Sequence, residues 1–185
     1  MNRRTASRLL LAAAVALSAA ACGSDDGSAQ SSGGTTAGAS SAQACETRSP
    51  TAEAPAGVSP DLTVAPAVPT TDAAPPCDLE ISDVVVGSGA EAVDGSTAAV
   101  KYVGAIYGTG EQFDSSWSRG ADETLPVTVG AGQVISGFDQ AVTGMKVGGR
   151  RMVVIPSDLG YGPNGQGPIP GGATLVFIID LVQVS

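Results

Sequence analysis

The sequence has 185 residues, a formal net charge of −9 and a hydrophobic fraction of 43%, but aromatic residues make up only 4%. The length fits one domain with a long tail, and so acidic a chain repels phosphate backbones, which argues against nucleic acid as a partner. Histidine is absent, which excludes Ser-His and Cys-His nucleophilic catalysis and histidine metal sites. We expect neither a metal ion nor an organic cofactor.

Residues 1–21 have the pattern of an export signal peptide, in which arginines precede an apolar stretch too short to span a bilayer. The alanines before Cys22 resemble the lipobox of bacterial lipoproteins, whose cysteine is acylated. We therefore expect lipidation at Cys22 and an extracytoplasmic protein anchored to the cell membrane. The same alanines also fit an A-x-A cleavage site, which would give a secreted protein instead. The Arg3-Arg4 pair resembles a twin-arginine signal, but the apolar residue expected soon after it is missing.

Residues 22–76 form a low-complexity segment of Ser, Gly, Thr, Ala and Pro without aromatic residues. Such a chain cannot bury enough surface to offset its conformational entropy, so we expect a disordered tether. Lipidation at Cys22 would leave Cys45 and Cys77, which commonly pair in an oxidising compartment. Closing a loop of about thirty residues would stabilise the fold by roughly 3–4 kcal/mol. The alternative is a pair of free thiols.

Residues 77–185 have the composition of a folded domain, because Val, Ile, Gly and aromatic residues now alternate with turn signals. Residues 79–86 are the first strand candidate. Residues 100–106 alternate with a period of two, which is typical of a half-buried strand. Further strands are expected over residues 127–129, 151–155 and 173–184. Residues 160–172 are dense in Gly and Pro and predict a loop.

One short helix is expected among these strands. Ser136 can cap its start, with Asp139 as a capping-box partner. Phe138, Ala141 and Val142 fall at positions i, i+3 and i+4 and give the helix one apolar face. Several antiparallel strands and one short helix predict an α+β domain in which the sheet wraps around the helix.

Short motifs follow one another in a fixed order between Tyr102 and Phe177. They are Tyr102, Phe113-Asp114-Ser115-Ser116, Arg119, Gly130, Gln133-Val134-Ile135-Ser136-Gly137-Phe138, Met145-Lys146-Val147-Gly148, Gly160-Tyr161-Gly162, Ile169-Pro170 and Ala173-Thr174-Leu175-Val176-Phe177. In this order and spacing the set resembles the signature of the FKBP-type peptidyl-prolyl cis-trans isomerases. The resemblance implies a curved antiparallel β-sheet around one short α-helix, which agrees with the elements expected above.

The resemblance also implies isomerisation of X-Pro bonds in proline-containing peptides or unfolded exported proteins, with macrolides as inhibitors of the same pocket. The residues it implies as catalytic are Tyr102, Asp114, Tyr161 and Phe177. Those it implies as substrate-binding are Phe113, Arg119, Leu125, Val134, Ile135, Phe138 and Ile169. By the same resemblance, the Tyr161 hydroxyl and the backbone N–H of Ile135 hold substrate carbonyls. We expect a monomer.

Some positions depart from the family pattern. Leu125 stands where the family often has Phe, Phe138 where its best-known members have Trp, and Gln133 where an acidic residue is usual. The loop between Tyr161 and Ile169 is one residue shorter. These changes bear on macrolide affinity and sequence preference.

The implied chemistry needs no nucleophile, which suits a chain without histidine. Amide resonance opposes rotation by about 18–20 kcal/mol, and that resonance is lost in the twisted transition state. A water-poor apolar pocket therefore favours the twisted state over the planar one. The alternatives are a proline-peptide binding module or holdase chaperone with little turnover, and an envelope scaffold that binds no proline peptide. Trp117, the sole tryptophan, has no predicted role.

Overall fold

The computed structural model describes Cys45 and residues 55–185. Its elements in chain order are β1 (Glu80–Val85), β2 (Thr97–Ile106), β3 (Gln112–Ser115), β4 (Leu125–Thr128), α1 (Ser136–Val142), β5 (Arg150–Ile155), the 3₁₀ turns η1 (Ser157–Leu159) and η2 (Gly162–Asn164), and β6 (Leu175–Val184). The strands form one antiparallel sheet in the order β1-β5-β6-β2-β3, with β4 paired to β2. This is the α+β architecture that the sequence predicts.

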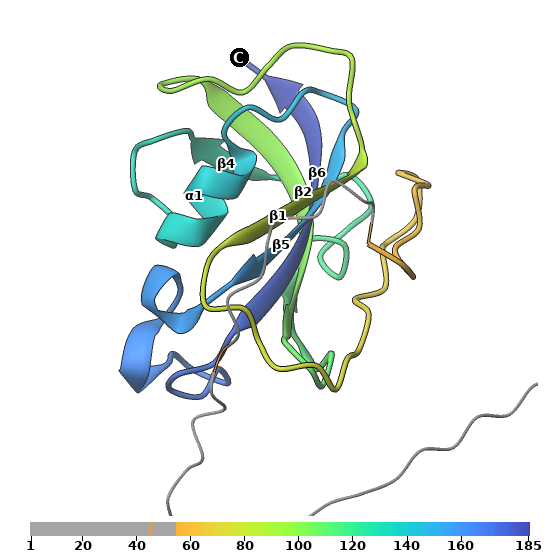
Figure 1. Ribbon diagram of the computed structural model, residues 1–185. Coiled ribbons are helices and arrows are strands. Elements are labelled where there is room, and N and C mark those ends of the chain that lie inside the picture. Colours follow the sequence, from red (N-terminus) through yellow and green to blue (C-terminus); the bar gives the residue numbers. More distant parts are fainter. Residues whose placement is uncertain (1–44, 46–54) are drawn as a thin grey trace, which may run out of the picture. The chain divides into compact units, whose positions relative to one another are not determined.

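The hydrophobic core lies between the sheet and α1, which covers one of the two sheet faces (Figure 1). The long central strands β2 and β6 are mostly apolar and largely buried. On the helix, Phe138, Ala141 and Val142 face inward and pack in one cluster with Val153 and Ile179. Fully burying an aliphatic or aromatic side chain contributes about 1.5–3 kcal/mol, so this cluster fixes the helix on the sheet.

The helix begins where expected, at Ser136, but the predicted cap is wrong. No side chain caps α1, and Ile135 precedes it with extended dihedrals. The Asp139 carboxylate instead accepts hydrogen bonds from the backbone N–H groups of Gly130 and Gly132, at 2.8 and 3.1 Å. Both glycines have positive φ, a conformation that costs glycine little. The N–H groups of this loop therefore point toward the helix. They bind the Asp139 carboxylate, which is then not available for a capping box.

Strand β3 is not predicted by the sequence pattern. Its four residues, Gln112 to Ser115, include only one apolar side chain, Phe113. A strand so short and polar has no clear period of two. It forms because it pairs with β2, opposite Val103 to Ala105.

The structure differs from the expected tether over residues 55–76. This segment runs along the sheet face opposite α1 (Figure 1), and Val58 within it is only 8% exposed. Three of its carbonyls accept hydrogen bonds from Arg150. Composition predicts disorder because apolar burial is small, but charge-assisted hydrogen bonds to backbone need no apolar side chain. We call residues 58–76 the strap.

The Cys45 and Cys77 thiols, expected to pair, form a disulfide, with Cα atoms 4.9 Å apart. The expected signal peptide, residues 1–21, and the lipidation site Cys22 lie outside the described residues, as does the rest of the expected tether before residue 55, apart from Cys45. Over the part of the chain that the structure describes, no helix is long and apolar enough to cross a membrane.

Candidate active site

Four aromatic rings from different elements converge at one end of the core. Tyr102 comes from β2, Phe113 from β3, Phe138 from α1 and Phe177 from β6. The Phe177 ring lies at the centre, with its centroid 6.2, 5.5 and 5.2 Å from those of Tyr102, Phe113 and Phe138. The contacts with Phe113 and Phe138 are edge-to-face, a geometry that stabilises by about 0.5–1.5 kcal/mol beyond burial. The rings therefore form a rigid apolar floor.

Gly104 on β2 allows these rings to meet. A Cβ atom at this position would lie 2.7 Å from Phe177 Cε1 and 2.8 Å from Phe113 Cζ. Both distances are far below van der Waals contact, so a larger residue would push the rings apart.

Above this floor lies a pocket of about 620 Å³. It is lined by Tyr102, Phe113, Asp114, Leu125, Gln133, Val134, Ile135, Phe138, Gly160, Tyr161, Gln166 and Phe177. A cavity of this size, lined by aromatic and aliphatic side chains together with several polar groups, suits a small molecule or a short peptide.

The structure brings together nine of the eleven residues implied as catalytic or substrate-binding. The two outside the lining are Arg119, which contacts the rim residues Asp114 and Tyr102, and Ile169, which is 7% exposed and belongs to the core cluster. Sequence reasoning did not assign Gly160 or Gln166 to the pocket. Gly160 could have been suggested by its place beside Tyr161 in the Gly160-Tyr161-Gly162 motif, and Gln166 only by its place in the Gly- and Pro-rich loop.

A polar network forms one side of the rim. The Tyr102 hydroxyl donates to Asp114 Oδ2 at 2.5 Å and accepts from Arg119 Nη2 at 2.9 Å. Arg119 Nη1 also donates to Asp114 Oδ1 at 2.7 Å. Each group thus holds the other two, which fixes the direction of the Asp114 carboxylate at the pocket mouth.

This network changes the acidity of its members. Burial raises the pKa of Tyr102, and its hydrogen bond to Asp114 raises it further. Burial alone would raise the pKa of Asp114, but hydrogen bonds from Tyr102, Arg119 and the Ser115 backbone outweigh burial and lower it. At neutral pH the pair is therefore a neutral tyrosine beside an ionised carboxylate.

The pocket is also lined by Tyr161, which immediately precedes η2. Its side chain is half-buried in the pocket wall, and this burial raises its pKa. The hydroxyl therefore keeps its proton at neutral pH and can donate a hydrogen bond to a bound carbonyl.

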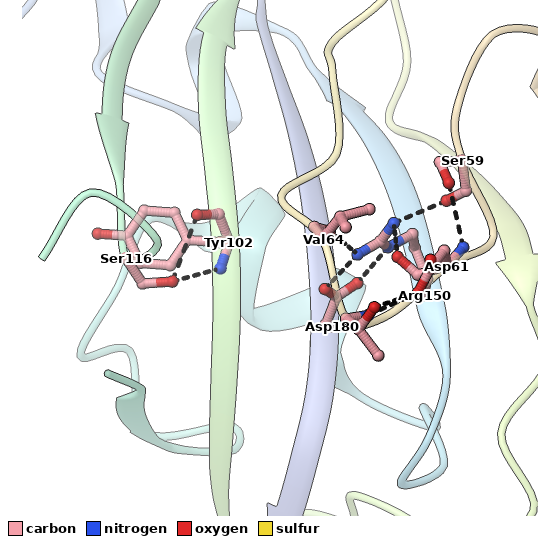
Figure 2. Close-up of polar contacts among 8 residues, drawn as sticks. Ser59, Asp61, Val64, Tyr102, Ser116, Arg150 and Asp180 are labelled. Atoms are coloured by element: carbon pink, nitrogen blue, oxygen red, sulfur yellow. Dashed lines mark hydrogen bonds and ion pairs between the residues drawn. The ribbon is translucent and has the colours of Figure 1, made fainter. Parts of the chain in front are cut away.

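Two further contacts shape the pocket walls. The Asp139 carboxylate holds the loop that leads to Val134 and Ile135. In Figure 2, Ser116 Oγ accepts a hydrogen bond from the Tyr102 backbone N–H, at 2.9 Å, and so fastens the end of β3 to β2. Both act on backbone segments that carry lining residues.

Trp117 follows β3 in the chain and has a structural place that the sequence did not reveal. The Lys101 ammonium lies over its ring, 4.4 Å from the centroid, and also donates to the Ala121 carbonyl. These contacts hold the β3–β4 connection, which carries Arg119, beside the pocket.

Residues 89–182 match the sequence profile of the FKBP-type peptidyl-prolyl cis-trans isomerases. The chain belongs to this family and is a peptidyl-prolyl cis-trans isomerase. Over 112 residues it is 54% identical to an FK506-binding protein of Streptomyces anulatus, covering 60% of this chain and 89% of that protein. Over 108 residues it is 50% identical to a probable FK506-binding protein of Corynebacterium glutamicum, covering 58% and 88%.

Solved structures agree with the family assignment. AtFKBP13 aligns with a TM-score of 0.53 and 37% identity, covering 58% of this isomerase and 93% of that chain. FkpA from Escherichia coli aligns with a TM-score of 0.53 and 34% identity, covering 64% and 52%. Among the residues that the structure describes, no group of three or more Cys, Asp and Glu side chains could hold a metal ion.

Proposed function

We propose that this isomerase accelerates cis-trans rotation of X-Pro bonds in exported proteins as they fold, by solvating the twisted amide in its aromatic pocket. The observation that supports this most directly is the convergence of Tyr102, Phe113, Phe138 and Phe177 on one hollow with Tyr161 at its rim. An uncatalysed X-Pro bond takes tens to hundreds of seconds to isomerise.

In this mechanism the proline ring rests on the aromatic floor and the preceding carbonyl points to the rim. As the C–N bond twists, the carbonyl loses resonance and becomes less polar, so a dry apolar wall costs the twisted state less than the planar one. The Tyr161 hydroxyl and the Ile135 N–H hold the carbonyls that flank the proline bond. They keep the substrate peptide from rotating as a rigid body, so that rotation occurs about the C–N bond. Each tenfold gain in rate requires about 1.4 kcal/mol of such selective stabilisation.

The assay is cis-trans isomerisation of a chromogenic proline peptide, with the full chain and a Tyr161→Phe/Asp114→Leu variant. We expect acceleration by the wild-type protein and its loss in the variant. Equal rates with and without the wild-type protein would refute the proposal. Binding of the peptide without acceleration would favour the holdase alternative. An FK506-type macrolide, which two relatives are named for binding, should compete for the same pocket.

We propose further that the protein acts outside the cytoplasm, as a monomer anchored through a lipidated Cys22. The leader pattern of residues 1–21 supports this, as does a disulfide, which persists in oxidising compartments. Mass spectrometry of the mature N-terminus tests it directly. A mature chain without a diacylglyceryl mass on Cys22 would remove the anchor.

A further inference from the structure

The strap is attached to the sheet by a fully buried arginine. Arg150, on β5, is 0% exposed. Its Nε and Nη2 donate to the two Asp180 oxygens at 2.5 and 2.6 Å. Its remaining N–H groups donate to the carbonyls of Ser59, Asp61 and Val64 at 2.7, 3.0 and 3.1 Å (Figure 2). A guanidinium has five N–H donors, and here the strap accepts three of the five bonds.

The other end of the strap is attached to the turn between β2 and β3. The Thr71 N–H donates to the Gly108 carbonyl at 3.2 Å, and the Tyr107 hydroxyl donates to the Ala74 carbonyl at 3.3 Å. Gly110 packs directly on the strap, because a Cβ there would lie 2.8 Å from Thr70 Cγ2. The strap thus joins this turn to β5 across the outer face of the sheet.

This turn leads directly into β3, which carries two of the pocket residues, Phe113 and Asp114. Strand β3 is at the edge of the sheet, and β2 is its only strand partner in the described part of the chain. Their pairing spans three residue pairs and includes a register shift next to Gly104. Backbone hydrogen bonds from Ile106 to Glu111 and from Ser116 to Tyr102 extend this pairing at its two ends. Because β3 has no strand on its other side in the described part of the chain, an attachment at the β2–β3 turn adds to the contacts that fix its position.

We propose that the strap is a positioning element of this isomerase: docked on Arg150, it holds the β2–β3 turn and thereby sets Phe113 and Asp114 in the pocket. Arg150 is its anchor, although it lies on the sheet face away from the pocket. The strap precedes the part of the chain that matches the family profile. The inference rests on the pocket acting in the isomerase reaction.

The test compares three substitutions within the strap of the full chain and one at Arg150. Val58→Asp puts a charge on a buried strap residue, whereas Val64→Asp puts the same charge on a strap side chain that is 47% exposed. Burying an unpaired carboxylate is strongly unfavourable, so only Val58→Asp should release the strap. Val58→Ile, which keeps an apolar side chain, should leave it docked. Arg150→Lys, with three donors in place of five, should weaken docking from the other side.

Two quantities are measured at a temperature where circular dichroism shows all variants folded: hydrogen exchange at the Thr71 amide and kcat/KM for a proline peptide. We expect Val58→Asp to speed exchange at least tenfold and to lower kcat/KM about three- to tenfold, while Val64→Asp and Val58→Ile match the wild type. A loss of global stability alone would not lower kcat/KM under these conditions, because every variant remains folded.

Faster Thr71 exchange with unchanged kcat/KM would refute the positioning role. Unchanged exchange in both Val58→Asp and Arg150→Lys would refute docking through Arg150. A wild-type kcat/KM no greater than background would count against the pocket mechanism itself and not against the strap, whose docking the exchange measurement reads independently.

Discussion

Gly104→Ala tests whether the aromatic floor is as tightly assembled as the structure shows. The new Cβ would lie 2.7 Å from Phe177 Cε1 and 2.8 and 2.9 Å from Phe113 Cζ and Cε2. The Phe113 ring is only partly buried and can swing outward, whereas Phe177 is 4% exposed and enclosed by the core. We therefore expect Phe113 to move furthest.

The size of the effect follows from opposing contributions. Overpacking a core position costs about 1–3 kcal/mol. Gly104 does not have the positive φ that only glycine tolerates well, so replacing it by alanine should also stabilise the chain by about 0.4–1 kcal/mol through the unfolded state. We expect a net loss of about 1–2 kcal/mol. Displacing Phe113 by an amount that removes about 1.4 kcal/mol of transition-state contact would lower kcat/KM about tenfold.

Urea unfolding and the proline-peptide assay measure these two effects. Phe113→Leu removes the ring atoms that meet the new Cβ, so Gly104→Ala/Phe113→Leu should be less destabilised than the sum of the two single variants. A Gly104→Ala protein with wild-type stability and kcat/KM would refute the reasoning, since it would mean that the rings of Phe113 and Phe177 do not meet over Gly104.

Three further predictions concern stability and its dependence on pH and redox state. Asp139→Ala should destabilise the fold by about 1.5–3 kcal/mol, because two backbone N–H groups lose a charged acceptor. The same change should raise KM in the peptide assay. An unchanged KM would contradict the role of Asp139 in shaping the pocket wall. The pKa of Asp114 is lowered in the folded state. The stability that Asp114 contributes is therefore complete above about pH 4 and is lost as the pH falls through its folded-state pKa. Asp114→Asn should make the urea midpoint less dependent on pH below about pH 4, while leaving the Tyr102 ring packed. Cys45→Ser should remove up to roughly 3–4 kcal/mol of loop-closure stabilisation, and a melting temperature insensitive to both this change and reduction of the Cys45–Cys77 bond would show that the loop contributes nothing.

Local patterns predicted most of the sheet and its helix. Alternating apolar residues located β2, and the apolar face of Phe138, Ala141 and Val142 located α1. These signals act over a few neighbouring residues, where side-chain type at a fixed spacing decides which face is buried. The edge strand β3 escaped detection because its formation depends on pairing with β2 and not on its own composition.

The candidate site was predicted through the family resemblance, which implied nine of the lining residues as catalytic or substrate-binding. Ile169 was named as a substrate contact, but its side chain belongs to the core. Asp139 was assigned to a helix cap, although its carboxylate binds the loop before the helix. In both cases the residue type suggested a contact. The contact partner lies in another segment of the chain, and the local sequence pattern does not show which segments the fold brings together.

By itself, the sequence indicated, through its resemblance to the FKBP family, an isomerase with an aromatic pocket whose chemistry needs no histidine, because side-chain type and order along the chain carry that information. Only the tertiary structure decided where the strap lies. Its attachment to Arg150 uses the carbonyls of Ser59, Asp61 and Val64. Every residue has such a carbonyl, so no residue type in the strap marks the contact before the chain folds.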